Sequence, residues 1–287
     1  MKDYEKELIN LIPEDMVYEK QTLSNDFIFG KTMQNKELCV ELITMLTGNE
    51  IDDSVTINNQ KPVKITSDSK GVRYDVYVED LKNSYDAEMQ NYNSLNDLPR
   101  RSRYYQGLMD LNLLESGKSY KQLKDSYIIF ICTYDPFGKS LCCYEFENTC
   151  INDTNLALED GRTILMFNTK GTIVNVSNEI KEFLDYIETK TATNDFLSKL
   201  DNEVEKVKQN KEWRIEYMKT WIRDMDIRED GYADGLAEGL ELGKQSGEDK
   251  LGKLICKLIE AGCDQDEIMR VSTDSEYRQE KFKEYEI

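Results

Sequence analysis

Residues 71–91 read GVRYDVYVEDLKNSYDAEMQN and contain two adjacent strand patterns. In its first half, apolar and aromatic side chains at positions 72, 74, 76 and 78 alternate with mostly polar ones, which is the two-residue period of a strand with one buried face. Residues 80–83 form a short hairpin connection, and residues 84–91 continue as a second strand. The stretch therefore predicts a β-hairpin.

The register of this hairpin determines which side chains meet. If the connection is centred between residues 81 and 82, residues whose numbers add up to 163 stand opposite one another. Asp75 then faces Glu88, and Arg73 faces Gln90. All four share one polar face, because residues two apart on a strand point the same way.

The opposed carboxylates are the feature of this face that suggests chemistry. Like charges directly opposite on a sheet are destabilising, and a cation between Asp75 and Glu88 would remove that penalty. Oxygen ligands of this kind suit Mg²⁺, with Mn²⁺ or Ca²⁺ as substitutes, and a water activated by the metal would be the nucleophile. The alternative is a chance juxtaposition, since 56 of the 287 residues are acidic.

The composition excludes several mechanisms. The chain contains no histidine, which rules out Ser-His-Asp and Cys-His triads, histidine-centred nucleases and imidazole zinc sites. With 37 Lys and Arg against 56 Asp and Glu, the formal charge of −19 also speaks against binding nucleic acid by bulk electrostatics. A metal-dependent phosphodiesterase is still compatible with this charge, because it needs local acid to hold its cations.

Hydropathy and cysteine spacing bear on where the protein works. No apolar run approaches the ~20 residues of a membrane span, and no basic, apolar leader is visible, so we expect a soluble cytoplasmic protein without membrane contact. The seven cysteines are odd in number and show no C-x-x-C spacing. We therefore expect reduced thiols in the core.

The segments around the hairpin alternate between helix and strand patterns. A helix is expected at 35–46, ended by Gly48, and a second one after Pro99, with Tyr104, Leu108 and Leu111 in its apolar stripe. Further strands are expected at 62–66, 126–134, 140–148 and 162–170. This order predicts an α/β fold in which helices flank a mixed sheet.

The C-terminal part of the chain has a different character. The strand pattern stops near residue 176, and we expect an α/β domain at 1–190 and an all-helical region at 191–287. Glycine recurs every fourth residue from 231 to 247, and in a helix each glycine costs about 1 kcal/mol relative to alanine. Either a second helix packs closely along this stripe, as in a homodimer, or the segment is an acidic linker. A helical hairpin turned at Gly262 is expected to follow.

Five segments, taken in order, resemble one known family. They are SNDFIFGKTM (24–33), YDVYVED (74–80), YDAEMQN (85–91), RRSRYYQGLMDLNLLESGKSY (100–120) and YIIFICTYD (127–135). Together they resemble the Rpn family of recombination-promoting nucleases, which are transposase-like members of the PD-(D/E)XK superfamily. The resemblance covers roughly residues 20–170, and the glycine-repeat tail is similar to that family's C-terminal region. It implies a PD-(D/E)XK nuclease fold and a metal-dependent DNA endonuclease linked to recombination, mobile elements or phage defence.

The resemblance also implies roles for individual residues. Asp75 and Glu88 would be metal ligands, with the backbone carbonyl of Met89 as a third, and Gln90 would stand at the family's catalytic Lys/Gln position. Glutamine carries no charge, so it can orient water or phosphate but cannot offset an oxyanion as lysine does. Asp26 matches the family's N-terminal acidic position and would either complete the metal shell or cap the first helix. The usual Pro-Asp pair is absent.

The segment from Pro99 to Lys124 is locally basic, with six basic residues against two acidic ones. It flanks the predicted site and is placed to contact DNA phosphates. The expected DNA contacts are Arg73, Arg100, Arg101, Arg103 and, by stacking, Tyr105. A solvated helix start is the alternative for the arginines, although positive charge near a helix N-terminus is unfavourable. Tyr104 is expected in the core.

Two functions are compatible with these patterns. The first is a Mg²⁺-dependent DNA endonuclease. The second is a catalytically weak or inactive relative that acts as a regulatory or interaction module through its helical tail, which the acidic charge and Gln90 favour.

Overall fold

The computed structural model describes residues 17–52, 54–63, 71–91 and 97–287. The chain divides into two compact units, one that ends at Tyr217 and one that runs from Met218 to Ile287. Among the described residues, no helix combines the length and the apolar character needed to cross a bilayer.

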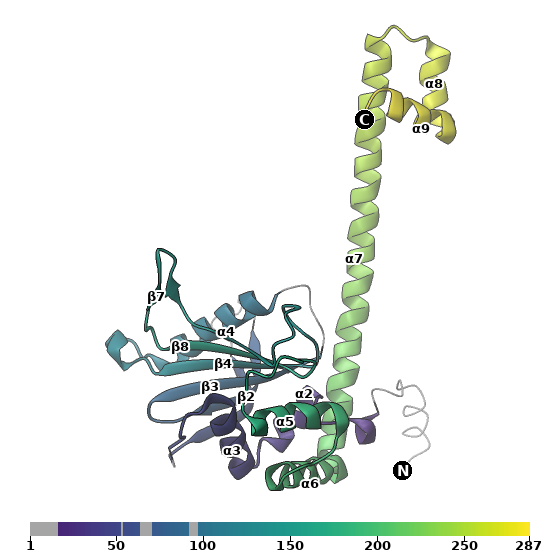
Figure 1. Cartoon of the computed structure of the whole chain (residues 1–287). Coiled ribbons are helices and arrows are strands. Elements are labelled where there is room, and N and C mark those ends of the chain that lie inside the picture. Colours follow the sequence, from purple (N-terminus) through teal and green to yellow (C-terminus); the bar gives the residue numbers. More distant parts are fainter. Residues whose placement is uncertain (1–16, 53, 64–70, 92–96) are drawn as a thin grey trace, which may run out of the picture. The chain divides into compact units, whose positions relative to one another are not determined.

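A six-stranded mixed sheet forms the centre of the first unit, with the strand order β1-β2-β3-β4-β8-β5 (Figure 1). The first three strands pair antiparallel, β3, β4 and β8 pair parallel, and β5 returns antiparallel beside β8. The strands are β1 (Thr56–Val63), β2 (Val72–Glu79), β3 (Asn83–Gln90), β4 (Asp125–Cys132), β5 (Cys143–Phe146) and β8 (Arg162–Asn168). The expected mixed sheet is confirmed.

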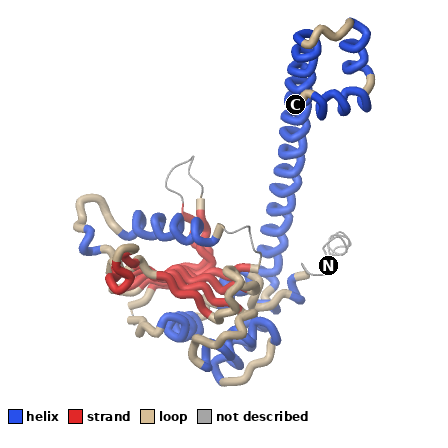
Figure 2. The backbone as a smooth tube through the Cα atoms, turned by 45° about the horizontal axis from the view of Figure 1, so that its top comes forward, coloured by secondary structure: helices blue, strands red, loops and turns tan. Residues whose placement is uncertain are grey.

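Helices cover both faces of this sheet (Figure 2). One face packs against α4 (Leu98–Leu113), which connects β3 to its parallel neighbour β4. The other face packs against α2 (Asp26–Thr32), α3 (Lys36–Thr47), α5 (Asn178–Thr189) and α6 (Asp195–Gln209). Short 3₁₀ turns occur at η2 (Tyr18–Lys20) and η3 (Tyr120–Gln122). The α3 helix ends at the expected Gly48, whose φ of 74° suits glycine.

The central hairpin has the register expected from the sequence. Val76 pairs with Ala87 and Glu79 with Ser84 across β2 and β3. The Asp80 carboxylate closes the two-residue turn by accepting the main-chain N–H groups of residues 82 and 83, at 2.8 and 2.7 Å. The turn chemistry therefore fixes the register.

The expectation of one exposed face on β2 is wrong. Val76 and Val78 pack in the cluster beneath α2 and α3, whereas Tyr74 and Tyr77 pack in the cluster beneath α4. In a regular strand, residues 74 and 76 would point to the same face. Here they point to opposite faces, so the strand is irregular at Asp75. Both faces are buried because helices cover both sides of the sheet.

Two strand predictions need adjustment. The strand expected at 62–66 begins earlier, at Thr56, and its residues 64–66 lie outside the described part of the chain. The strand expected at 140–148 is limited to Cys143–Phe146, and a small two-stranded sheet follows it that periodicity did not indicate. Its strands are β6 (Thr149–Cys150) and β7 (Asp153–Ala157).

The α4 helix forms where expected but turns a different face to the sheet. Leu108 is buried as expected, but Tyr104 and Leu111 of the expected apolar stripe are 40% and 65% exposed. Ser102, Gln106 and Met109 are buried instead. The face of α4 that contacts the sheet carries small and polar side chains as well as apolar ones. The spacing of apolar residues alone therefore does not identify this face.

The first unit continues beyond the expected boundary near residue 190. Helix α6 packs against α2, and its Leu197, Leu200 and Val204 belong to the same apolar cluster as the sheet. Tyr217 joins this cluster at the end of the unit.

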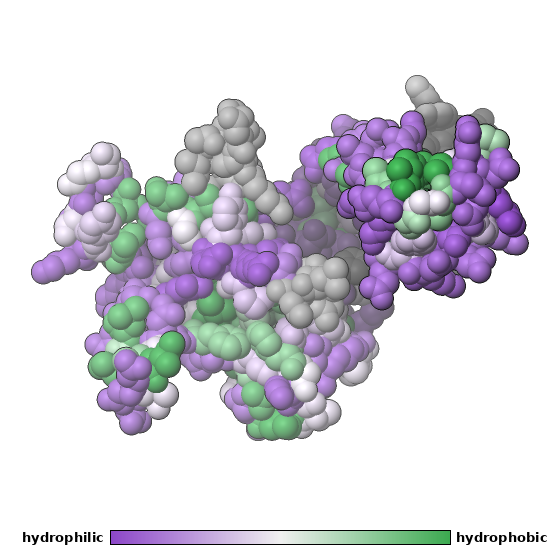
Figure 3. Space-filling model, turned by 90° about the horizontal axis from the view of Figure 1, so that it is seen from above, coloured by the Kyte–Doolittle hydropathy of each residue, from purple (hydrophilic) through white to green (hydrophobic). Residues whose placement is uncertain are grey.

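The second unit consists of most of α7 (Lys211–Glu260), α8 (Gln265–Thr273) and α9 (Ser275–Glu284). The chain turns at Gly262, as expected, and a small core of Leu254, Leu258 and Val271 joins the helices. Seen from above, hydrophilic side chains surround a small hydrophobic patch at the tip of this unit (Figure 3). The glycines from 231 to 247 lie within α7, and apart from the adjacent backbone of the helix itself, no described atom lies within 4 Å of the position that a Cβ would take.

The seven cysteines are all free thiols. Four are buried, namely Cys39, Cys132, Cys142 and Cys143. Cys256 is exposed, which differs from the core position expected for all seven.

Candidate active site

Asp75 and Glu88 meet where the regular β2–β3 ladder ends. The Asp75 N–H donates to Glu88 Oε1 at 3.1 Å, and the Met89 N–H donates to Asp75 Oδ2 at 3.3 Å. Each carboxylate therefore accepts a main-chain hydrogen bond from the opposite strand. The predicted juxtaposition of the two acids is present.

Both carboxylates are buried, with 7% of Asp75 and 3% of Glu88 exposed. Burial and then the charge of Glu88 raise the pKa of Asp75 well above its usual range. Burial and then the charge of Asp86 do the same to the pKa of Glu88, against the opposing effects of its hydrogen bond and of Arg101. Shifts of this kind are typical of functional sites, and a bound cation would stabilise the charged forms.

Asp86 is a third acid of this site that sequence reasoning missed. It is fully buried, and neither of its carboxylate oxygens has a hydrogen-bond partner among the described residues. Burial, followed by the charge of Asp75, raises its pKa well above the usual range. The signal was present in the sequence, because Asp86, Glu88 and Gln90 are spaced two apart and share one face of β3.

Arg101 reaches into this site from α4. Its Nη1 donates to Gln90 Oε1 at 2.7 Å, and its Nη2 donates to the Tyr105 hydroxyl at 3.0 Å and lies 3.5 Å from Glu88 Oε2. Gln90 Nε2 in turn donates to the same Glu88 oxygen at 3.4 Å. Burial by itself would lower the pKa of Arg101. The neighbouring Tyr105 and Glu88 outweigh this effect, so the pKa is raised.

Arg73 and Asp26 lie together at the exposed side of the site. The expected pairing of Arg73 with Gln90 is replaced by an ion pair with Asp26, at 3.9 Å between Nη2 and Oδ2. Asn25 is the N-cap of α2, while Asp26 accepts the N–H of Phe27 at 2.8 Å as the first residue of the helix. The charge of Asp26 also raises the pKa of Asp75, so Asp26 lies near the acid pair.

The other expected DNA contacts point in different directions. Arg100 and Arg103 are exposed and form no ion pair with any described residue. Tyr105 is half-buried, and its ring packs edge-on against Tyr74 with centroids 5.7 Å apart. The basic cluster is therefore divided into two outward arginines and one inward arginine, with Tyr105 packed beside the inward one.

The donor set fits a hard divalent cation. Within the described part of the chain, no three Asp, Glu, Cys or His side chains converge into a cage that could hold a metal by themselves. Mg²⁺ does not need such a cage, because it commonly uses one or two carboxylates together with water and substrate oxygens. The acid pair Asp75–Glu88 supplies that number of carboxylates.

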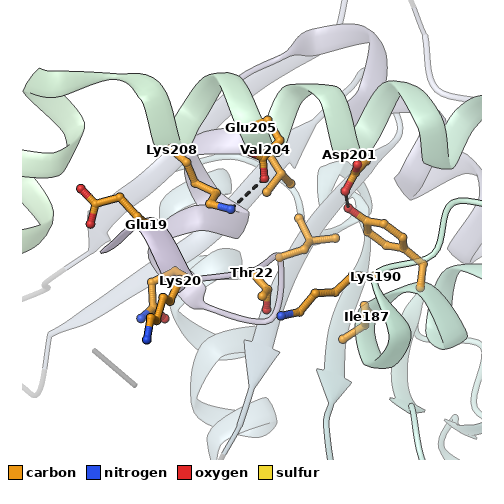
Figure 4. Close-up of a pocket in the computed structure, with 12 residues that line it drawn as sticks. Glu19, Lys20, Thr22, Ile187, Lys190, Asp201, Val204, Glu205 and Lys208 are labelled. Atoms are coloured by element: carbon orange, nitrogen blue, oxygen red, sulfur yellow. Dashed lines mark hydrogen bonds and ion pairs between the residues drawn. The ribbon is translucent and has the colours of Figure 1, made fainter. Parts of the chain in front are cut away.

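A separate pocket of about 330 Å³ lies among η2, α5 and α6 (Figure 4). Its charges are largely paired, with Lys208 bonded to Glu205 at 2.7 Å and the Tyr186 hydroxyl bonded to Asp201 at 2.8 Å. None of the acids of the β2–β3 hairpin lines it. The candidate site is therefore separate from this pocket.

Comparison with known protein families matches residues 24–230 to the PD-(D/E)XK nuclease family transposases. No curated protein and no solved structure matches the chain. The matched region contains the hairpin with its acid pair, α4 and the remaining strands of the sheet, and it confirms the resemblance seen in the motifs. The chain belongs to the PD-(D/E)XK nuclease family transposases.

Proposed function

We propose that the protein is a metal-dependent DNA endonuclease that hydrolyses phosphodiester bonds at the hairpin of β2 and β3. The observation that carries this proposal is the pair of buried carboxylates, Asp75 and Glu88, held opposite each other in a member of a nuclease family. An element-mobility, recombination or phage-defence role follows from the same family.

Asp75 and Glu88 would be the metal ligands in this proposal, with the Met89 carbonyl as a third and Asp26 as a further acid that could complete the metal shell. Mg²⁺ is the expected cofactor, and Mn²⁺ or Ca²⁺ can take its place. When bound, the cation would neutralise the carboxylates and polarise the phosphate and a water molecule. Gln90 would orient the water or the phosphate by hydrogen bonds.

DNA would approach along the exposed start of α4. Arg100 and Arg103 are free of ion pairs with described residues and project to solvent, and Arg73 lies at the exposed side of the acid pair. Phosphate contacts of this kind position the duplex without reading its sequence. Tyr105 would support this surface by packing rather than by stacking on a base, because its ring is already enclosed by Tyr74 and Phe130.

Plasmid cleavage tests the proposal. The wild-type chain should nick or linearise supercoiled DNA in Mg²⁺ and not in EDTA, and Asp75→Asn or Glu88→Gln should abolish cutting without lowering the melting temperature. The matched control is Asp153→Asn, at an exposed acid of β7, which should cut like wild type. Cutting that survives either site substitution would refute the assignment.

A second candidate is a regulatory member of the family that acts through a homodimer of its C-terminal helices. The exposed stripe of α7, with Tyr232, Leu236 and Leu240 beside the glycines, favours it. Sedimentation should then show a dimer that Gly239→Leu weakens. A monomer at all concentrations, unchanged by Gly239→Leu, would exclude this function.

A further inference from the structure

We propose that Arg101 supplies, from helix α4, the positive charge that Gln90 lacks, and that it is a catalytic residue rather than a DNA-backbone contact. This inference rests on the proposed nuclease function. It assigns to the site a cation that lies on a different element from the strand position where the family carries its Lys or Gln.

The direction of the side chain separates Arg101 from its neighbours. Arg100 and Arg103 are exposed, whereas the Arg101 guanidinium lies between Gln90, Tyr105 and Glu88. An arginine that served only to hold DNA would face solvent as the other two do.

The charges of the site require a cation at this position. Asp75, Asp86 and Glu88 are all buried, and Arg101 is the one cation that forms an ion pair with any of them within the described residues. Gln90 and Arg101 converge on the same oxygen, Glu88 Oε2. The two side chains together place a hydrogen-bond donor and a positive charge where a single lysine would provide both.

The guanidinium is held in a fixed orientation. Its central carbon lies 5.3 Å from the ring centroid of Tyr105 and 5.8 Å from that of Phe130. Arginine has five N–H groups, so it can serve Gln90 and Tyr105 and still donate to a phosphate oxygen as negative charge builds up in the transition state. Tyr105 is thus a positioning residue for Arg101.

Three measurements on the full-length protein test this role: Mn²⁺ affinity by calorimetry without DNA, DNA affinity in Ca²⁺, and plasmid cleavage in Mg²⁺. Arg101→Gln should lower cleavage about 10²-fold or more. It should also tighten Mn²⁺ binding by about tenfold, because a positive charge beside the metal ligands is removed. Its DNA affinity should stay within about twofold of wild type.

Two further variants separate charge from shape and from DNA contact. The double variant Gln90→Lys with Arg101→Gln returns a positive charge to the site from β3, and it should recover about tenfold or more of the lost cleavage. Arg103→Gln is the matched outward control, and it should weaken DNA binding and leave Mn²⁺ affinity unchanged. Melting temperatures of all variants, with Arg101→Lys as a milder change, identify any loss of folding.

The inference is overturned if Arg101→Gln leaves Mn²⁺ affinity unchanged and weakens DNA binding as Arg103→Gln does. It is also overturned if the double variant cuts no better than Arg101→Gln. Failure of the proposed function has a different signature, because wild type would then bind Mn²⁺ but cut no DNA. Tighter Mn²⁺ binding by Arg101→Gln would in that case still place its charge beside the metal.

Discussion

The two units of the chain carry acidic residues in opposite settings. In the first unit, Asp75, Asp86 and Glu88 are buried between the sheet and α4. In the second unit, residues 224–241 of α7 contain seven acidic side chains and one basic one, and all of them are exposed. The more acidic segment therefore has no buried carboxylate, and the site with fewer acids has three.

Burial and register, rather than the number of acids, distinguish the carboxylates of the hairpin from those of α7. On α7, water solvates each charge, and neighbouring acids contribute only to net charge and solubility. In the hairpin, the fold withholds water from the acids and opposes Asp75 to Glu88, so that a cation is the natural counter-charge. The predictions below separate the two settings.

The largest effect is expected on cleavage. Asp75→Asn or Glu88→Gln should lower the rate by about 10³-fold or more, because a catalytic metal contributes several kcal/mol to the transition state. Asp230→Asn and Glu238→Gln, on the exposed acidic stretch of α7, should leave the rate within about twofold. Equal losses from both pairs of substitutions would remove the distinction between the two regions.

The next effect concerns metal binding and stability. Saturating Mg²⁺ should stabilise the first unit by about 2.7 kcal/mol when its concentration is 100 times the Kd. Calorimetric scans with Mg²⁺ and with EDTA measure this shift. Asp75→Asn should lose the shift, and Asp230→Asn should keep it. A shift that persists in Asp75→Asn would place the bound metal elsewhere.

Asp86→Asn should stabilise the metal-free protein at neutral pH. The substitution removes a buried carboxylate that has no hydrogen-bond partner among the described residues. We expect a gain of about 1–3 kcal/mol, or roughly 2–12 °C in the melting temperature of the first unit. Thermal melts of the two proteins in EDTA give this difference. A less stable Asn variant at pH 8 would show that the Asp86 charge is compensated.

The gain from Asp86→Asn should depend on pH. Burial raises the pKa of Asp86 in the folded protein. Below about pH 4, the ordinary Asp range, the carboxyl is protonated in the folded and the unfolded protein, and Asp86 does not destabilise the fold. As the pH rises toward the folded-state pKa, the unfolded protein loses this proton first, so wild type loses stability. Wild type and the Asn variant should thus have similar melting temperatures near pH 4 and diverge above it. Asp153→Asn, at an exposed acid, should follow wild type throughout.

The smallest effect is expected in α7. Gly235→Ala should stabilise the helix by up to about 1 kcal/mol, because no described atom lies near the new methyl group. Gly262→Ala should have the opposite sign, since this glycine has a φ of 77°. Hydrogen exchange of the α7 amides measures both changes, and neither should alter cleavage. Destabilisation by Gly235→Ala would show that another helix occupies the stripe.

Local rules were sufficient to predict the hairpin. The Asp80 turn sets the register, and this register places Asp75 beside Glu88, one position beyond the last ladder pair of Val76 with Ala87. The same rules missed the burial of this face, because it depends on α4, whose contact surface includes the polar Ser102 and Gln106. Whether such a face is buried depends on tertiary packing, and the spacing of apolar residues does not predict it.

The inward direction of Arg101 could not be predicted for a related reason. Three arginines lie within four residues, and composition treats them alike. Which one enters the site depends on the rotation of α4 about its axis, and that rotation is fixed by the packing of Leu98 and Met109 on the sheet. The extent of the first unit likewise depends on the docking of α6 against α2, which lies far from it in sequence.

Oxidative mapping can locate a metal bound at Asp75 and Glu88. Fe²⁺ would replace Mg²⁺ in the full-length protein, and ascorbate with peroxide would then cut the polypeptide next to the bound iron, with the cut sites read by mass spectrometry. Cuts are expected near Asp75 and within residues 86–90, and they should be lost in Asp75→Asn and suppressed by excess Mg²⁺. Cuts confined to the exposed acids of residues 224–241, or unchanged in Asp75→Asn, would contradict this position of the metal.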